Sequence, residues 1–154
     1  MFQGQLITIF IAPAAGQPMI EIGQVLAVPG KGLDGDRYFT GRGNYSDRPG
    51  PDREVTLIEI EALQALEQEG GIHLAPASAR RNLVTQGVPL NHLVGREFQV
   101  GEVTLRGVRL CEPCNYLAGL TQAQVLPALV HRGGLRAQVV AGGILRAGDV
   151  ITDD

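Results

Sequence analysis

The chain has 154 residues, of which 44% are apolar and 19% charged. This length and composition fit a single folded domain over residues 1–154 and exclude a disordered or fibrous protein. The 13 basic residues are outnumbered by 16 acidic ones, so no nucleic-acid partner is expected, because such proteins need a basic surface.

Two residue types are unusual in number. The 21 glycines are about twice the usual share, and together with 9 prolines they indicate many tight turns and a mainly β fold. All basic residues except Lys31 are arginines. This bias fits either bidentate recognition of phosphate and carboxylate groups or the codon usage of a GC-rich genome.

The N-terminal third predicts two strands and a long loop. β-Branched and aromatic residues predict a strand over 5–11. An imperfect apolar alternation predicts a second strand over 20–28, with a bulge at Gly23. Residues 29–53 carry few large apolar side chains. A connection of this length is typical of a binding loop or lid, and its alternative is a plain mobile loop.

The next segment predicts the best helix of the chain. A short strand over 55–58 runs into 59–69, where apolar residues recur at helical spacing, and glycines at 70–71 should end the helix. Ser78 should cap a brief helical turn before a strand over 82–85.

The C-terminal half contains two similar stretches, 95–103 and 142–150. Each predicts a strand, a tight glycine-acid turn and a return strand, which is typical of closed or highly curved sheets. Further strands are predicted over 103–110 and 135–140, and a helix over 120–130.

Cys111 and Cys114 follow the strand predicted over 103–110, and the pattern leaves three chemistries open. Structural zinc needs four ligands, and the histidines do not supply a second pair at the usual spacing. A thioredoxin-like pair needs a parallel β-α-β context, which is not predicted upstream. The third interpretation is one nucleophilic or metal-ligating thiolate beside a resolving or neighbouring cysteine, which Arg81, Arg132 or Arg136 would stabilise. Two buried, inert cysteines are the alternative.

Five stretches in order carry a family resemblance: Gly-Leu-Asp-Gly-Asp-Arg-Tyr at 32–38, Arg-Asn-Leu-Val-Thr at 81–85, Pro-Cys at 113–114, His-Arg-Gly-Gly at 131–134 and Gly-Asp at 148–149. Together they resemble the MOSC domain family, the molybdenum cofactor sulfurase C-terminal domain, in its small stand-alone form. The resemblance runs from about residue 5 to residue 152.

The resemblance implies a mainly β, MOSC-like barrel with a few short helices that binds the molybdenum cofactor or delivers sulfur. Cys114 matches the family's cysteine, which carries a persulfide in sulfurase-type members and ligates molybdenum in reductase-type members. Cys111 matches less regularly, and its role stays open. The alternatives are a molybdenum-dependent reductase of N-hydroxylated compounds and a non-catalytic pterin- or anion-binding module.

The candidates for binding the cofactor are cationic, amide or glycine residues of these stretches, with one acid: Lys31, Asp36, Arg37, Arg81, Asn82, His131, Arg132, Gly133 and Gly134. Asp36 either contacts the ligand or pairs with an arginine. His131 either acts as a base or hydrogen-bond donor near the thiol or caps the preceding helix.

The sequence also predicts partners and a location. No pyridoxal-phosphate-dependent desulfurase domain and no ferredoxin-like cysteine set is recognised, so a cysteine desulfurase or an electron-donor protein is expected to serve the chain, and a molybdoenzyme could accept its product. The apolar run 6–13 is too short to span a bilayer, so the chain is expected in the cytoplasm, away from membranes.

Overall fold

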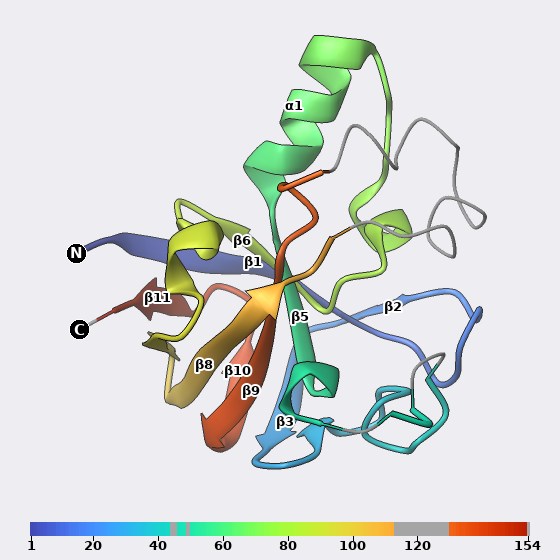
Figure 1. Cartoon of the computed structure of the whole chain (residues 1–154), viewed down its shortest axis with the longest axis vertical. Helices are drawn as coiled ribbons and strands as arrows, with labels where there is room; N and C mark the ends of the chain where they lie inside the picture. The colour runs from blue at the N-terminus through green and yellow to red at the C-terminus, as the bar shows by residue number, and fades with distance from the viewer. Residues whose placement is uncertain (44–45, 49, 113–129, 154) are drawn as a thin grey trace.

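The computed structural model describes residues 1–43, 46–48, 50–112 and 130–153. Within these residues the chain is mostly β, and the predicted fold class is confirmed. The larger sheet has the strand order β11-β7-β8-β9-β5-β6-β1-β2, and a further pairing of β11 with β1 closes seven of these strands into a barrel (Figure 1). Its strands are β1 (Gln3–Ile11), β2 (Ile20–Ile22), β5 (Val55–Glu59), β6 (Leu83–Gln86), β7 (Glu97–Val100), β8 (Val103–Leu110), β9 (Leu135–Ala141) and β11 (Val150–Thr152).

A smaller sheet and short helices complete the described part of the chain. The sheet pairs β10 (Gly143–Arg146), β3 (Gln24–Val28) and β4 (Gly32–Leu33) in that order. The α-helix α1 (Ile60–Gly70) confirms the predicted helix, and Gly71 ends it in the left-handed conformation with φ 64°. Three short 3₁₀ helices are η1 (Pro51–Arg53), η2 (Pro76–Ala79) and η3 (Leu90–Leu93).

Two apolar clusters hold these elements. Alternate side chains of the strands fill the barrel, among them Leu6, Leu57 and Leu135, which are fully buried. On the outer side, α1 packs Leu63 and Leu66 into a second cluster that includes residues of β1, β5 and β6. The strands therefore bury alternate side chains, and α1 buries the side chains of one face, as the two periodicities require.

Three sequence predictions are wrong in detail. The strand predicted over 20–28 breaks at Gly23, because β2 joins the larger sheet while β3 joins the smaller one. The stretch 142–150 is not a hairpin, since β10 pairs with β3 and β11 pairs with β1 and β7. Ser78 does not cap a helix, because it lies inside η2, whose N-cap position is Ala75.

The connection between β5 and β6 also departs from expectation. These strands are parallel neighbours, and α1 lies between them in the sequence, so the chain does contain a β-α-β unit upstream of Cys111. Cys111 itself follows β8, which is antiparallel to both of its neighbours. The long loop over 29–53 is likewise not without structure, because it contains β4 and η1.

Candidate functional site

Arg81 is the centre of the candidate site. The residue lies between η2 and β6 in the sequence, its side chain is buried, and its guanidinium donates to three carbonyl oxygens, two of them from distant parts of the chain. Nε donates to Gly133 at 2.8 Å, Nη2 to Cys111 at 3.1 Å and Nη1 to Ala79 at 3.3 Å. A planar guanidinium can serve several acceptors at once, so this one side chain fixes three segments relative to each other.

The segment after β8 and the segment before β9 are also joined directly. The backbone N–H of Cys111 donates to the carbonyl of Gly134 at 2.7 Å, and the Cys111 side chain is buried. Gly134 has a φ of 107°, and a Cβ built there would collide with the carbonyl oxygen of Leu57 in β5. Glycine is required at this position by both the backbone conformation and the close approach of β5.

Asn82, beside Arg81, uses its amide inside the protein. Its Oδ1 accepts from the backbone N–H of Thr56 at 3.0 Å and from the Thr56 hydroxyl at 3.1 Å, and its Nδ2 donates to the carbonyl of Phe10 at 3.1 Å. These bonds connect β1, β5 and the start of β6. The structure therefore gives Asn82 a role in holding Arg81 in register.

Asp36 and Arg37 form a buried pair in the loop after β4. Asp36 Oδ1 accepts from Arg37 Nη1 at 3.2 Å and from the backbone N–H of Ala12 at 3.0 Å. Arg37 also reaches the neighbour of Arg81, because its Nη2 donates to the carbonyl of Arg80 at 3.3 Å. Asp36 thus pairs with an arginine, the second of the two roles expected for it. Arg37 links this loop to the segment that carries Arg81.

His131 stands in the left-handed conformation, with φ 62°, which is uncommon for a residue other than glycine. Glu112 supports it twice: Oε1 accepts from the His131 backbone N–H at 2.7 Å, and Oε2 lies 2.9 Å from Nδ1. The His131 carbonyl accepts from Asn91 Nδ2 at 2.8 Å. Sequence reasoning missed Glu112 and Asn91, although an acid two positions before Cys114 was a visible signal.

The exposed side chain of Arg132 pairs with an acid of α1. Its guanidinium forms a bidentate pair with the Glu69 carboxylate, with Nη1 at 2.9 Å and Nη2 at 3.1 Å from the two oxygens. The hydrogen bonds that Arg132 donates to Glu69, followed by the negative charge of Glu69, raise the pKa of Arg132 above its usual value. Gly133, the next residue, is buried and supplies the carbonyl that Arg81 Nε holds.

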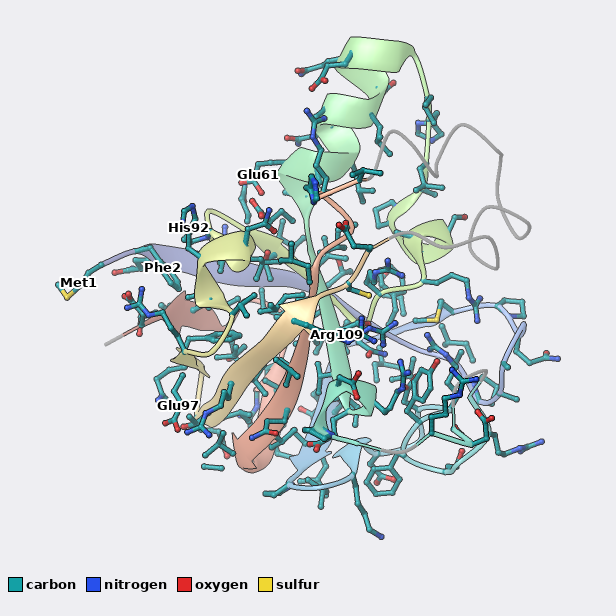
Figure 2. All side chains as sticks on the ribbon, viewed as in Figure 1. Met1, Phe2, Glu61, His92, Glu97 and Arg109 are labelled. Carbon is teal, nitrogen blue, oxygen red and sulfur yellow. The ribbon has the colours of Figure 1, made fainter. Side chains whose placement is uncertain are left out.

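Two arginines of the neighbouring strands β8 and β9 form a further group. Arg109 of β8, which is labelled in Figure 2, and Arg136 of β9 are register partners. Both reach η1, because Arg109 Nε donates to the Asp52 carboxylate at 2.9 Å and Arg136 Nη1 donates to the Asp52 carbonyl at 3.2 Å. Burial acts to raise the pKa of Asp52, but the Arg109 hydrogen bond and the Arg53 charge hold it below its usual value. The buried Arg136 Nε has no hydrogen-bond partner among the described residues.

Not every predicted site residue joins this group. Lys31 lies in another neighbourhood, where its Nζ is 5.4 Å from the centroid of the Phe39 ring. Cys114 and the predicted helix over 120–130, apart from Val130, lie outside the described residues. Within the described ranges, no three His, Cys, Asp or Glu side chains are placed to hold a metal ion. In those same ranges, no helix has the length and apolar character of a membrane span.

Comparisons with known proteins agree on the fold. A family model described as MOSC domain matches residues 44–152. The YuaD protein from Bacillus subtilis superposes with a TM-score of 0.81 at 17% identity, over 98% of this chain and 97% of that one. YiiM from Geobacillus stearothermophilus gives 0.72 at 14% identity, over 97% and 74% of the two chains. YiiM from Escherichia coli gives 0.66 at 21% identity, over 99% and 69%. No curated protein matched the sequence significantly.

Proposed function

The chain belongs to the MOSC domain family, and we propose that it binds the molybdenum cofactor beside Arg81 and carries sulfur as a persulfide on Cys114. The family is associated with this cofactor. The proposal for this chain is supported by the residues that the structure gathers around Arg81.

One observation carries the proposal. The three-way contact of Arg81 joins the segment 79–82, the end of β8 at Cys111 and the segment 131–134. These segments are far apart in the sequence, and each adjoins or contains one of the stretches that resemble the family. Their convergence at one buried cation is what a shared binding site requires, whereas independent surface loops would have no need of it.

The donors at this site fit an anionic cofactor. The molybdenum cofactor carries a phosphate and a pterin, and phosphate is best bound by guanidinium N–H groups. Arg81 has five N–H donors, of which the three carbonyl contacts leave some for a ligand, and the buried Nε of Arg136 has no partner within the described residues. Arg136 is the register partner of Thr56, which is hydrogen-bonded to Asn82 beside Arg81, so Arg81 and Arg136 would together hold the cofactor. When bound, it supplies a redox-active metal with soft sulfur ligands.

The sulfur chemistry is proposed for Cys114. Its thiolate attacks the terminal sulfur of a cysteine persulfide on a desulfurase partner. A new sulfur–sulfur bond forms at Cys114 Sγ, the partner's sulfur–sulfur bond breaks, and the partner's cysteine leaves as a thiolate, so no external oxidant or reductant is consumed. A molybdoenzyme or its cofactor is the proposed acceptor of this sulfur.

The test is mass spectrometry of the full chain after incubation with a cysteine desulfurase and free cysteine. We expect a gain of one sulfur atom on a peptide containing Cys114, removed by dithiothreitol. The matched pair of variants is Cys114→Ser, which should abolish the gain, and Cys111→Ser, which should retain it because Cys111 is buried.

The outcomes separate the alternatives. A gain located on Cys111 would contradict the assignment to Cys114. If no sulfur is gained but molybdenum is bound and is then lost in Cys114→Ser, the cysteine is a metal ligand, as in a molybdenum-dependent reductase. If ligand binding survives Cys114→Ser unchanged and no sulfur is gained, the chain is a non-catalytic binding module.

A further inference from the structure

A cavity of about 310 Å³ lies beside the C-terminal half of α1, and the proposed function assigns it no role. Its volume falls at the lower end of the range of binding pockets, roughly 300–1,000 Å³. Its wall includes Ala65, Leu66, Glu69, Ile72, Val130 and Arg132. Arg132 is followed by Gly133, whose carbonyl Arg81 holds, so the cavity adjoins the candidate site along the chain.

The floor of this cavity is apolar. Leu66 is buried and belongs to the second apolar cluster, and Ile72 packs against that cluster. Val130, on the other wall, leaves 48% of its surface exposed. The second cluster therefore continues into the cavity and ends at an apolar side chain that faces water. An apolar group that enters here removes surface on both walls from water, which favours its binding.

The rim of the cavity is formed by the end of α1, and its charges are unfavourable for the helix itself. The last turn of α1 contains no basic residue, and it carries Glu67 and Glu69, whose side chains are 65% and 61% exposed. A helix C-terminus already bears a partial negative charge, so acids in the last turn destabilise it. This end of α1 lies farthest from the barrel strands (Figure 1).

The ion pairs at this rim offset its negative charge only in part. Arg132 pairs with Glu69 through two hydrogen bonds. Glu67 Oε2 lies 3.9 Å from Nδ1 of His73, which is beyond hydrogen-bond distance. Two carboxylates and the helix end thus outweigh the charge of Arg132. The rim is therefore complementary to cations that a partner would bring.

We propose that this cavity docks a protein partner through an apolar side chain flanked by basic residues. The apolar side chain enters between α1 and Val130, and the flanking cations lie at Glu67 and Glu69. An uncharged ligand would leave the rim charge uncompensated, and a basic segment without an apolar side chain would leave the floor in water. A segment with both features satisfies the floor and the rim together.

The test is a fluorescence titration with a synthetic peptide that carries one tryptophan between two arginines on each side. The chain contains no tryptophan, so indole emission reports on the peptide alone. We expect a saturable blue shift, because the indole leaves water when it enters the cavity. A second peptide with glutamine in place of each arginine should bind roughly ten-fold more weakly, because it lacks the charges that match the rim.

Two variants of the chain test the floor and the rim, each with a matched control. Ala65→Leu fills the cavity and should weaken binding by about ten-fold or more, whereas Gln64→Leu adds the same side chain at an exposed position outside the lining. Glu69→Gln removes a rim charge and should weaken binding by about two- to five-fold. Its control is Glu97→Gln, which removes an exposed acid of β7 that is also paired with an arginine, Arg106 (Figure 2). Both controls should bind the peptide as the unmodified chain does.

Four results would overturn the proposal. The arginine peptide fails to bind saturably, or the glutamine peptide binds equally well, which would make an uncharged molecule the occupant. The Ala65 and Glu69 variants bind as their controls do. Light scattering shows the unmodified chain to be a dimer that Ala65→Leu dissociates, which would make a second copy of the chain the occupant.

This inference stands apart from the proposed function. The titration uses neither sulfur nor the molybdenum cofactor, and Arg81 does not line the cavity. Absence of sulfur on Cys114 would leave the peptide result intact, and absence of peptide binding would leave the sulfur result intact.

Discussion

Replacing Arg81 by alanine removes the contact that joins the three segments of the candidate site. The side chain donates to carbonyl oxygens at 2.8, 3.1 and 3.3 Å. A hydrogen bond from a charged group contributes about 1.5–3 kcal/mol, and the two longer contacts count toward the lower end. Because some carbonyls will regain a water, we expect Arg81→Ala to lower the free energy of unfolding by about 3–5 kcal/mol.

This loss is a large part of the total free energy of unfolding. Domains of this kind have unfolding free energies of about 5–15 kcal/mol, so the variant should remain folded but with a clearly lower urea midpoint. Arg81→Lys keeps the charge but loses the fork, and should recover only about one bond's worth, roughly 1–2 kcal/mol. Both are measured by urea unfolding with linear extrapolation.

The matched control is Arg106→Ala, which removes an exposed arginine of β8 paired with Glu97. Exposed pairs contribute about 0–1 kcal/mol, so this variant should stay near the unmodified chain. If Arg81→Ala costs no more than Arg106→Ala, the three carbonyl contacts do not hold the segments of the site together.

Three further changes test other parts of the structure. Gly134→Ala places a Cβ against the Leu57 carbonyl at a φ of 107° and should cost about 3 kcal/mol or more; an unchanged melting temperature would contradict the close approach. Asn82→Asp replaces a donor to the Phe10 carbonyl with a buried charge and should cost about 2–4 kcal/mol in urea unfolding, whereas Asn82→Asp with normal stability would show that the amide is not needed. Burial raises the pKa of Glu54, so its protonated form favours the fold: this contribution is complete below the unfolded pKa near 4.5 and is lost as pH rises through the folded pKa. The unfolding free energy of Glu54→Gln minus that of the unmodified chain should therefore rise as pH rises from 4 to 8. A difference that falls over this range would refute this sign.

Local sequence patterns predicted the elements whose signals are local. The strand 5–11 and the helix 59–69 follow from residue type and apolar period, and Gly71 supplies the left-handed residue that ends α1. The pairing of strands did not follow from such patterns. The stretches 95–103 and 142–150 look alike, yet only the first is a hairpin, because β10 pairs with β3, and β11 pairs with β1 and β7.

The candidate site shows the same division. Arg81 was predicted from its place in a recognisable stretch, but its carbonyl partners at Cys111 and Gly133 could not be, since they depend on how β6, β8 and β9 meet. Asn82 was expected to face a ligand, and its amide is instead bonded between β1 and β5. Lys31 was grouped with the cofactor residues, but the fold places it over Phe39. Residue type indicates chemistry, while the tertiary fold decides where that chemistry is used.

We propose above that this MOSC protein holds the molybdenum cofactor at the Arg81 group. The most direct measurement is the molybdenum and pterin content of the full chain purified from cells that make the cofactor, compared with Arg136→Gln, which removes the donor that lacks a partner in the described part of the structure. We expect equal amounts of metal and pterin with the unmodified chain and a clear reduction of both in the variant. Protein that carries neither metal nor pterin from such cells would contradict it.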